Sequence, residues 1–233
     1  MMNFSVVVFD VGRTLMEYKD MPNSWLDYYP KAFEHVNQKL GLNLDSEQLN
    51  KSLETFRSFS PSINYREHDC TPEEIFSEVT AGWNKTFKLS DVIDAFFESM
   101  NLQAYIYPDT VPVLKKLKDE GFKIAALTDV ATGMPDSMHK SYFSELLEYF
   151  DMYVSSSSCG FKKPNIKGLQ DISEGLNASA ADMIMVGDEP KDIEVAKRFG
   201  CKSVHIDRNN SGEFYGEDYK ISDLYGLLKI LEI

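Results

Sequence analysis

Residues 6–15 read VVVFDVGRTL, a short apolar run that ends at a carboxylate. Residues 6–9 are mostly β-branched and carry no polar side chain, which is typical of a strand buried on both faces of a parallel sheet. The run is too short to span a bilayer and has no basic residue before it, so it predicts a strand and not a signal sequence. Asp10 would therefore lie at the carboxyl end of the first strand.

Similar apolar runs recur later in the chain, each preceded by a stretch in which apolar residues have helical spacing. One stretch, around Leu114 and Leu117, stops at Gly121, and another ends at Gly200, as helices commonly do. This alternation predicts an α/β fold with a doubly wound, mainly parallel, Rossmann-like sheet, because right-handed crossovers place helices on both faces. The later strands are expected at residues 123–127, 152–154, 183–186 and 203–206.

Residues 17–100 break this alternation, with helical periodicity and no convincing strand. Within them, residues 71–74 (TPEE) form a capping box with proline at the first helical position, which marks the start of a helix. We therefore expect residues 1–16 and 101–233 to form a core domain and residues 17–100 an inserted all-helical unit. Its other helices are expected to carry Phe33, Val36 and Leu40, then Leu49, Leu53 and Phe56, then Val92, Phe96 and Met100.

The 233 residues carry a formal net charge of −13, from 24 basic and 37 acidic side chains. This charge would repel a nucleic-acid backbone, and no basic cluster or basic amphipathic helix suggests docking to nucleic acid or to a membrane. The three cysteines are widely separated and lack Cys-x-x-Cys spacing, so neither a disulfide framework nor a zinc site is expected. A cytoplasmic location fits this composition, and the sequence does not indicate an oligomeric state.

Polar side chains follow three of the predicted strands. Asp10 follows the first, Thr128 and Asp129 follow the second, and Asp188 follows residues 183–186 after one glycine. Each of them, taken alone, is typical of a helix N-cap. Ligands bind beyond the carboxyl ends of parallel strands, which lie about 4.8 Å apart, so these side chains are expected to converge. Converging carboxylates repel unless a cation or proton lies between them, so capping alone does not explain the set.

The carboxylates in this set indicate a metal site. Asp188 and Asp192 are four residues apart, and Pro190 suits the first helical turn, so both can point out of one helix start. With Asp10 they form an oxygen-only donor set that suits Mg²⁺, although Asp192 alone also reads as a solvated acid. Lys163 could neutralise a phosphoryl group and moderate the charge of Asp10, although a surface lysine is the usual reading.

In order and spacing, these residues resemble the four motifs of the haloacid dehalogenase superfamily of hydrolases, most of whose members are phosphatases. The resemblance spans nearly the whole chain, because the insertion at residues 17–100 looks like this family's helical cap. It implies that residues 1–16 and 101–233 form a Rossmann-like catalytic core. The motifs are residues 9–15 (FDVGRTL), Leu127-Thr128, Lys163-Pro164, and Gly187-Asp188 through Asp192.

The resemblance also implies a reaction, the hydrolysis of a small phosphorylated molecule with Mg²⁺ as cofactor. Asp10 would attack phosphorus to form an aspartyl-phosphate, which water then hydrolyses. Thr128 and Asp129 would bind the phosphoryl oxygens, and Lys163 would hold both the phosphoryl group and the nucleophile. The metal ligands would be Asp10, the backbone carbonyl of Gly12, Asp188 and Asp192.

Gly12 departs from the family pattern, which usually has a second aspartate there to protonate the leaving oxygen and later activate water. Loss of such general acid–base help typically costs about 10²- to 10⁴-fold in rate. We therefore expect a preference for aryl or acyl phosphates, whose leaving groups depart easily. His35, His68 and Asp69 are candidates for a replacement acid. Arg13, where the pattern usually has glycine, is a second departure without an assigned role.

Two alternatives stay open. One is a phosphonate or carbon–halogen hydrolase of the same superfamily, because those members also lack the second aspartate. Gly12 and the pair Asp188 and Asp192 argue against a dehalogenase, and phosphonate cleavage needs a cap lysine that forms a Schiff base. The other is a non-catalytic or weakly active phosphatase-like binding protein. The candidate lysines are Lys19, Lys31, Lys85 and Lys88, and the side chains that could line the substrate entrance are Trp25, Tyr28, Tyr65 and Arg66.

Overall fold

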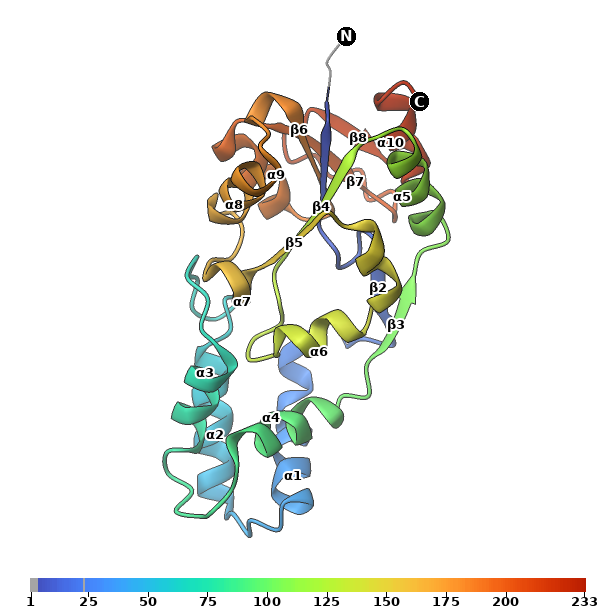
Figure 1. The fold of residues 1–233 in the computed structure, drawn as a ribbon. Coiled ribbons are helices and arrows are strands. Elements are labelled where there is room, and N and C mark those ends of the chain that lie inside the picture. The colour runs from blue at the N-terminus through green and yellow to red at the C-terminus, as the bar shows by residue number, and fades with distance from the viewer. Residues whose placement is uncertain (1–3, 23) are drawn as a thin grey trace.

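The computed structural model describes residues 4–22 and 24–233 and contains a six-stranded parallel sheet, which lies in the upper half of Figure 1. The strands of this sheet are β1 (Val6–Phe9), β4 (Lys123–Thr128), β5 (Met152–Ser155), β6 (Met183–Gly187), β7 (Lys202–Ile206) and β8 (Tyr219–Ile221). Their order is β5-β4-β1-β6-β7-β8, so β1 lies between β4 and β6. The predicted parallel α/β sheet is confirmed. The edge strand β8 has no counterpart among the predicted strands, because its three residues are too few for a recognisable apolar run.

The register of the central strands brings polar residues to one edge of the sheet. Phe9 is level with Ala126 of β4 and with Val186 of β6. Because the three strands run in the same direction, the residues that follow them leave the sheet at the same edge. These residues are Asp10, Asp129 and Asp188, and Thr128 is the last residue of β4.

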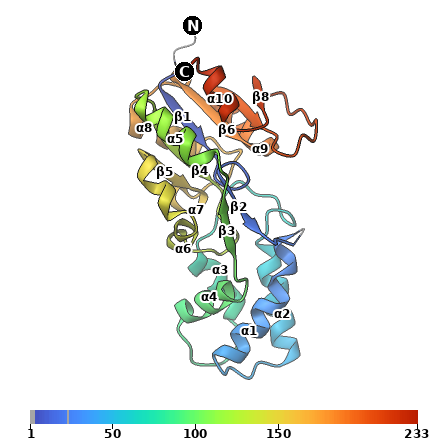
Figure 2. The same ribbon diagram turned by 90° about the vertical axis from the view of Figure 1, so that its right-hand side faces the viewer.

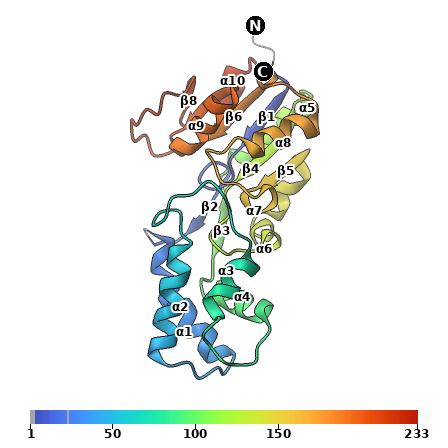
Figure 3. The same ribbon diagram turned by 90° about the vertical axis from the view of Figure 1, so that its left-hand side faces the viewer.

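Helices cover both faces of the sheet, which explains why β1 is apolar throughout (Figures 2 and 3). The helices of this domain are α5 (Thr110–Asp119), α6 (Asp136–Ser141), α7 (Ser156–Cys159), α8 (Lys167–Leu176), α9 (Pro190–Phe199) and α10 (Tyr225–Ile230). Val7 packs into one buried cluster with Leu114 of α5, and Val8 packs into another with Leu169 of α8. As predicted, α9 ends at Gly200, whose φ of 92° lies in the left-handed region.

Four further helices pack together away from the sheet, and we call residues 29–98 the helical unit (Figure 1). They are α1 (Tyr29–Lys39), α2 (Ser46–Ser58), α3 (Pro72–Thr80) and α4 (Leu89–Glu98). Their core is aromatic: the ring of Phe96 lies 4.7 Å from that of Phe56 and 5.0 Å from that of Phe33. The predicted capping box is present, since Thr71 accepts a hydrogen bond from the backbone of Glu74. No helix in residues 4–22 or 24–233 has both the length and the apolar composition needed to cross a membrane.

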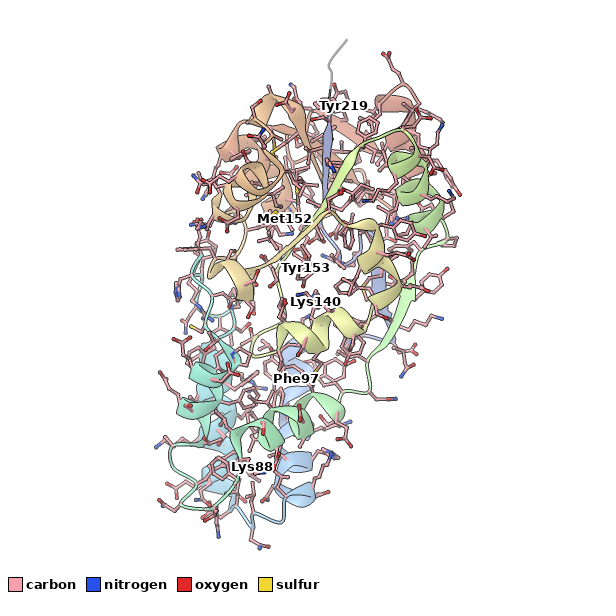
Figure 4. All side chains as sticks on the ribbon, in the orientation of Figure 1. Lys88, Phe97, Lys140, Met152, Tyr153 and Tyr219 are labelled. Carbon is pink, nitrogen blue, oxygen red and sulfur yellow. The ribbon has the colours of Figure 1, made fainter. Side chains whose placement is uncertain are left out.

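The α6 segment connects the sheet to the helical unit. Val130 and Met134, which precede α6, belong to the same buried cluster as Phe97 of α4. On α6 itself, the Lys140 ammonium lies 4.4 Å from the centroid of the Tyr153 ring on β5, and Figure 4 shows these two side chains above Phe97. The helical unit is therefore packed against the core domain through apolar contacts.

An antiparallel ribbon, β2 (Met16–Lys19) and β3 (Gln103–Ile106), also connects the two parts. The expectation that residues 17–100 contain no strand is therefore wrong for the end of β2. This strand has only four residues, too few for their alternation to stand out, and its partner β3 lies far along the chain, so local pattern did not reveal it. The division into domains at residues 17 and 100 stays a prediction, and the ribbon crosses it.

Candidate active site

Asp10 and Lys163 form a buried ion pair at the carboxyl edge of the sheet. The Lys163 Nζ lies 2.5 Å from Asp10 Oδ1 and donates a hydrogen bond of 3.2 Å to the Leu127 carbonyl. The backbone N–H of Asp10 donates to the Val186 carbonyl at 2.8 Å, which fixes Asp10 against β6. Only 1% of the lysine side chain is exposed, so the reading of Lys163 as an ordinary surface lysine is wrong.

Two further aspartates hold Lys163 in place. Asp192 Oδ1 lies 2.6 Å from Lys163 Nζ, and Asp129 Oδ1 accepts a hydrogen bond of 3.0 Å from the Lys163 backbone. Burial opposes the ammonium form, but the charges of Asp10 and Asp192 keep the pKa of Lys163 well above its ordinary value. Lys163 therefore carries a positive charge next to Asp10 at neutral pH.

Asp192 is buried at the start of α9 and is not a solvated acid. Its Oδ2 accepts a hydrogen bond of 3.0 Å from the backbone of Glu189, so one oxygen caps the helix while the other faces Lys163. A Cβ atom on Gly187 would lie 2.3 Å from Asp192 Cγ. Only a glycine leaves room for this approach, which explains the glycine at the end of β6.

Asp10, Asp188 and Asp192 form a cluster in which each offers an oxygen within 4.8 Å of the others. Burial raises the pKa of Asp10 to about 7, against the opposing charge of Lys163 and with help from Asp192. Burial and the charges of Asp10 and Asp192 raise the pKa of Asp188 to about 8. These shifts come first from burial and then from repulsion among the carboxylates, and a divalent cation between them would oppose both. The all-oxygen donor set fits Mg²⁺, and the Gly12 carbonyl stays a predicted ligand.

Arg13 contacts the same cluster, and its role could not be assigned from the sequence. Its Nε lies 3.0 Å from Asp188 Oδ2, and its Nη2 donates to Glu189 Oε1. Burial opposes the shift, but the charges of Asp188 and Glu189 raise the pKa of Arg13. The φ of Arg13 is 56°, in the left-handed region that favours glycine. The usual glycine at this position of the family pattern was therefore a signal for this backbone conformation.

Thr128 and Asp129 leave β4 at the wall of the same site. Asp129 Oδ2 lies 3.1 Å from Lys191 Nζ, while Oδ1 holds the Lys163 backbone. Burial opposes the shift, but the charges of Lys191 and Lys163 lower the pKa of Asp129. Asp129 therefore positions two lysines, and Thr128, which is buried at the strand end, stays the predicted ligand of the phosphoryl oxygens.

A cavity of about 770 Å³ extends from these residues to the helical unit, and Trp25, Tyr65 and Arg66 line it. The candidate acids His68 and Asp69 are not among the described residues of its wall, and neither are His35 and Tyr28. Asp69 instead forms an ion pair of 3.0 Å with Lys162, in which both side chains are buried. Glu17 of β2 does line the cavity, and no sequence pattern singled it out.

The lysines in the described part of the cavity wall are each paired with an aspartate. Lys162 pairs with Asp69, Lys163 pairs with Asp10, and Lys191 lies against Asp129. A Schiff base needs an uncharged lysine amine at the substrate, so this wall gives phosphonate cleavage no support. The lysines considered for that role, which are not among the described wall residues, are Lys19, Lys31, Lys85 and Lys88.

Curated phosphatases resemble the chain in sequence. It is 34% identical over 100 residues to the phosphoglycolate phosphatase of Neisseria meningitidis, an alignment that covers 43% of this chain and 42% of that protein. It is 26% identical over 209 residues to the pyrophosphatase PpaX of Bacillus mycoides, which covers 81% of this chain and 94% of that protein. The chain thus spans less than half of the first relative and nearly all of the second.

Solved structures share the fold. The crystal structure of an HAD phosphatase from Thermococcus onnurineus covers 98% of both chains with a TM-score of 0.64 and 24% identity. A 2-haloacid dehalogenase from Pseudomonas syringae covers the same share of both chains with a TM-score of 0.67 and 18% identity. The model of the family described as haloacid dehalogenase-like hydrolase matches residues 7–206, which includes every strand-end residue of the site. The chain therefore belongs to the haloacid dehalogenase-like hydrolases.

Proposed function

We propose that this protein is a Mg²⁺-dependent phosphatase of small phosphorylated molecules, with Asp10 as its nucleophile. The observation that carries the proposal is the buried ammonium of Lys163, 2.5 Å from Asp10 Oδ1, beside a cluster of three carboxylates. An ammonium and a carboxylate held at one strand end, with room for a divalent cation, form a site in which a dianionic phosphoryl group can be attacked.

The residues divide the reaction into two displacements. A carboxylate oxygen of Asp10 forms a bond to phosphorus while the bond from phosphorus to the leaving oxygen breaks. Water then attacks the aspartyl-phosphate, releasing phosphate and the free carboxylate. Lys163 offsets negative charge on the phosphoryl oxygens in both steps. The hydroxyl of Thr128 donates a hydrogen bond to one of these oxygens.

Asp10, Asp188 and the Gly12 carbonyl would hold Mg²⁺, with Asp192 at the edge of its coordination sphere. Bound there, the ion would neutralise charge on the phosphoryl oxygens. Arg13 keeps one oxygen of Asp188 in place, which leaves the other for the metal. Asp192 holds the Lys163 ammonium in place. The ammonium and Mg²⁺ would therefore lie next to each other beside Asp10.

A phosphate-release assay on an aryl phosphate tests this function. We expect release to stop in a chelator and to return on addition of Mg²⁺. Asp188→Asn should raise the Mg²⁺ concentration for half-maximal rate by about 10-fold or more, because it removes a charged ligand. The matched control is Asp182→Asn, which changes a half-buried aspartate that is not among the described cavity residues. Metal-independent release would contradict the proposed role of Mg²⁺, and a complete absence of release would favour a binding protein.

We infer further that the substrate carries a second anionic group. Arg66 lines the cavity, its Nε donates to the His68 carbonyl at 3.1 Å, and its Nη2 is buried without a hydrogen-bond partner among the described groups. A buried, unpaired donor costs about 1–3 kcal/mol, so an anion that reaches this guanidinium would relieve that cost. The names of the two relatives point to phosphoglycolate and pyrophosphate, and each of these molecules carries a second anionic group beside the phosphoryl group.

Arg66→Ala should therefore separate two kinds of substrate. We expect kcat/KM for phosphoglycolate to fall about 10- to 100-fold, because a hydrogen bond between charged groups is lost, while kcat/KM for phenyl phosphate stays unchanged. Lys51→Ala is the control, since it removes a cation of the helical unit that is not among the described residues lining this cavity. An equal loss of kcat/KM on both substrates would show that Arg66 supports the fold and does not bind the second anionic group.

A further inference from the structure

The loop between α2 and α3 of the helical unit is paired with the loop that carries Lys163. The backbone N–H of Lys162 donates to the Glu67 carbonyl at 2.6 Å, and the N–H of Asp69 donates to the Gly160 carbonyl at 2.9 Å. Between these bonds, His68 and Phe161 form an antiparallel bridge. Residues 67–69 and 160–162 thus form a short two-stranded contact across the two parts of the molecule.

Side chains strengthen this contact on one side of Lys163. Lys162 Nζ lies 3.0 Å from Asp69 Oδ2, and about 6% of each side chain is exposed. The same ammonium donates to the Val130 carbonyl at 3.0 Å and lies 3.4 Å from Ser156 Oγ. Lys162 therefore joins the helical unit, the segment before α6 and the start of α7. Removal of one partner of such a buried pair leaves an uncompensated charge, which is strongly destabilising locally.

Glu67 makes the matching contacts on the other side. Its Oε2 accepts a hydrogen bond of 3.1 Å from Asn165 Nδ2, and its Oε1 pairs with Arg198 Nη1 of α9 at 2.7 Å. Residues 67–69 therefore hold Lys162, directly before Lys163, and Asn165, two residues after it. From the core domain, the backbone of Lys163 itself receives one side-chain contact among the described residues, from Asp129.

We propose that Asp69 and Glu67 are positioning residues, which place the Lys163 ammonium against Asp10 through the backbone of residues 160–165. The expected effect on kcat rests on the proposed function. A charged group must sit within about 1 Å of its working position, because such a misplacement can cost about 10²-fold in rate. When the helical unit is docked, Lys163 lies between Asp10 and Asp192; when residues 67–69 separate from residues 160–162, Lys163 loses that support. The docking of the helical unit thereby controls the charge beside the nucleophile.

Because Lys162 and Lys163 are adjacent, loss of Asp69 is expected to disturb Lys163 in a specific way. Lys162 and Lys163 are consecutive, and each ammonium is buried against a different aspartate. The charge of Lys162 already contributes to the low pKa of Asp129, the residue that holds the Lys163 backbone. Without Asp69, Lys162 is left without a carboxylate partner, and the nearest carboxylate that its charge already influences is that of Asp129. Lys162 then competes with Lys163 for Asp129.

Two variants test the proposal by kinetics and by hydrogen exchange. We expect Asp69→Asn to lower kcat for phenyl phosphate about 10- to 100-fold with KM within about 2-fold, since Asp69 is not among the described wall residues. Glu67→Gln, which breaks the Arg198 pair without exposing a buried charge, should show the same split with a smaller loss. Asp69→Glu, which keeps the negative charge beside Lys162, should retain most of the wild-type kcat. Glu98→Gln, which breaks the exposed pair with Lys39 inside the helical unit, is the control and should match the wild type.

Hydrogen exchange of the metal-free proteins gives the second readout. In Asp69→Asn and Glu67→Gln, backbone amides of residues 160–165 should lose protection while those of β6 keep theirs. Unchanged protection at residues 160–165, or lost protection with an unchanged kcat, would overturn the proposal. If the wild type hydrolyses no phosphate ester, the proposed function fails, while the exchange result still decides whether residues 67–69 hold the Lys163 loop.

Discussion

Replacement of Asp10 by asparagine is expected to abolish Mg²⁺-dependent phosphate release, with kcat lowered by about 10⁴-fold or more. The amide has nearly the size of the carboxylate, but it cannot form the acyl-phosphate bond and carries no charge for the metal. Lys163 keeps Asp192 as a partner, so the fold around the site should survive the change. The measurements are the initial rate on an aryl phosphate at saturating Mg²⁺ and the mass of a trapped phosphorylated Asp10 peptide.

Asp207 provides a matched control within the same sheet. It follows β7 as Asp10 follows β1, but its carboxylate accepts hydrogen bonds from the backbone of Ser211 at 2.8 Å and of Gly212 at 3.1 Å. It is not among the described residues of the cavity wall, so Asp207→Asn should weaken the loop and leave kcat unchanged. Wild-type activity in Asp10→Asn, or an equal loss in both variants, would remove Asp10 from the role of nucleophile.

Gly12→Asp is expected to raise kcat on alkyl phosphates by about 10²- to 10⁴-fold, the usual contribution of a positioned general acid and base. The structure has room for the new side chain, because no atom lies within 4 Å of a Cβ built on Gly12. The φ of Gly12 also lies outside the left-handed region, so the aspartate can adopt the backbone without strain. Rates on aryl phosphates should change little, because their leaving groups depart without a proton.

Gly12→Asn separates acid–base chemistry from the effects of size. It fills the same space with an amide that cannot donate a carboxylic proton, so it should bring no gain on alkyl phosphates. An equal gain from both substitutions would contradict the acid–base explanation. Equal kcat/KM of the wild type on matched aryl and alkyl phosphates would mean that another group supplies the proton. Glu17, which lines the cavity and accepts a hydrogen bond from Tyr107 at 2.9 Å, would then be the first to replace.

The parallel sheet could be predicted because its information is local. Residues 6–9 are uniformly apolar since they pack against helices on both faces, and the polar residue that follows marks the end of the strand. Parallel pairing then brings Asp10 and Asp188 to one edge without any knowledge of side-chain positions. The position of β2 could not be predicted in this way, because it has only four residues and its partner β3 is distant in the sequence.

The contacts that tune the site are not visible in local sequence. From the sequence alone, Lys163 resembles an ordinary surface lysine. In the structure, three aspartates from different segments contact it. Arg13 reaches Asp188 across a large separation in sequence, and Lys162 is neutralised by a residue of the helical unit. Such ion pairs depend on which loops the fold brings together, so charge alone did not distinguish Lys162 from Lys163.

The position of β1 in the middle of the sheet has a consequence for the order in which the chain folds. Val6 pairs with Lys123 on one side and with Met183 on the other, so β1 can pair only after partners more than one hundred residues downstream have been made. The helical unit, whose four helices all lie within residues 29–98, can fold in the meantime, because partners nearer in sequence lose less entropy when they meet. In a nascent chain the helical unit could therefore fold before the sheet that positions Asp10 exists.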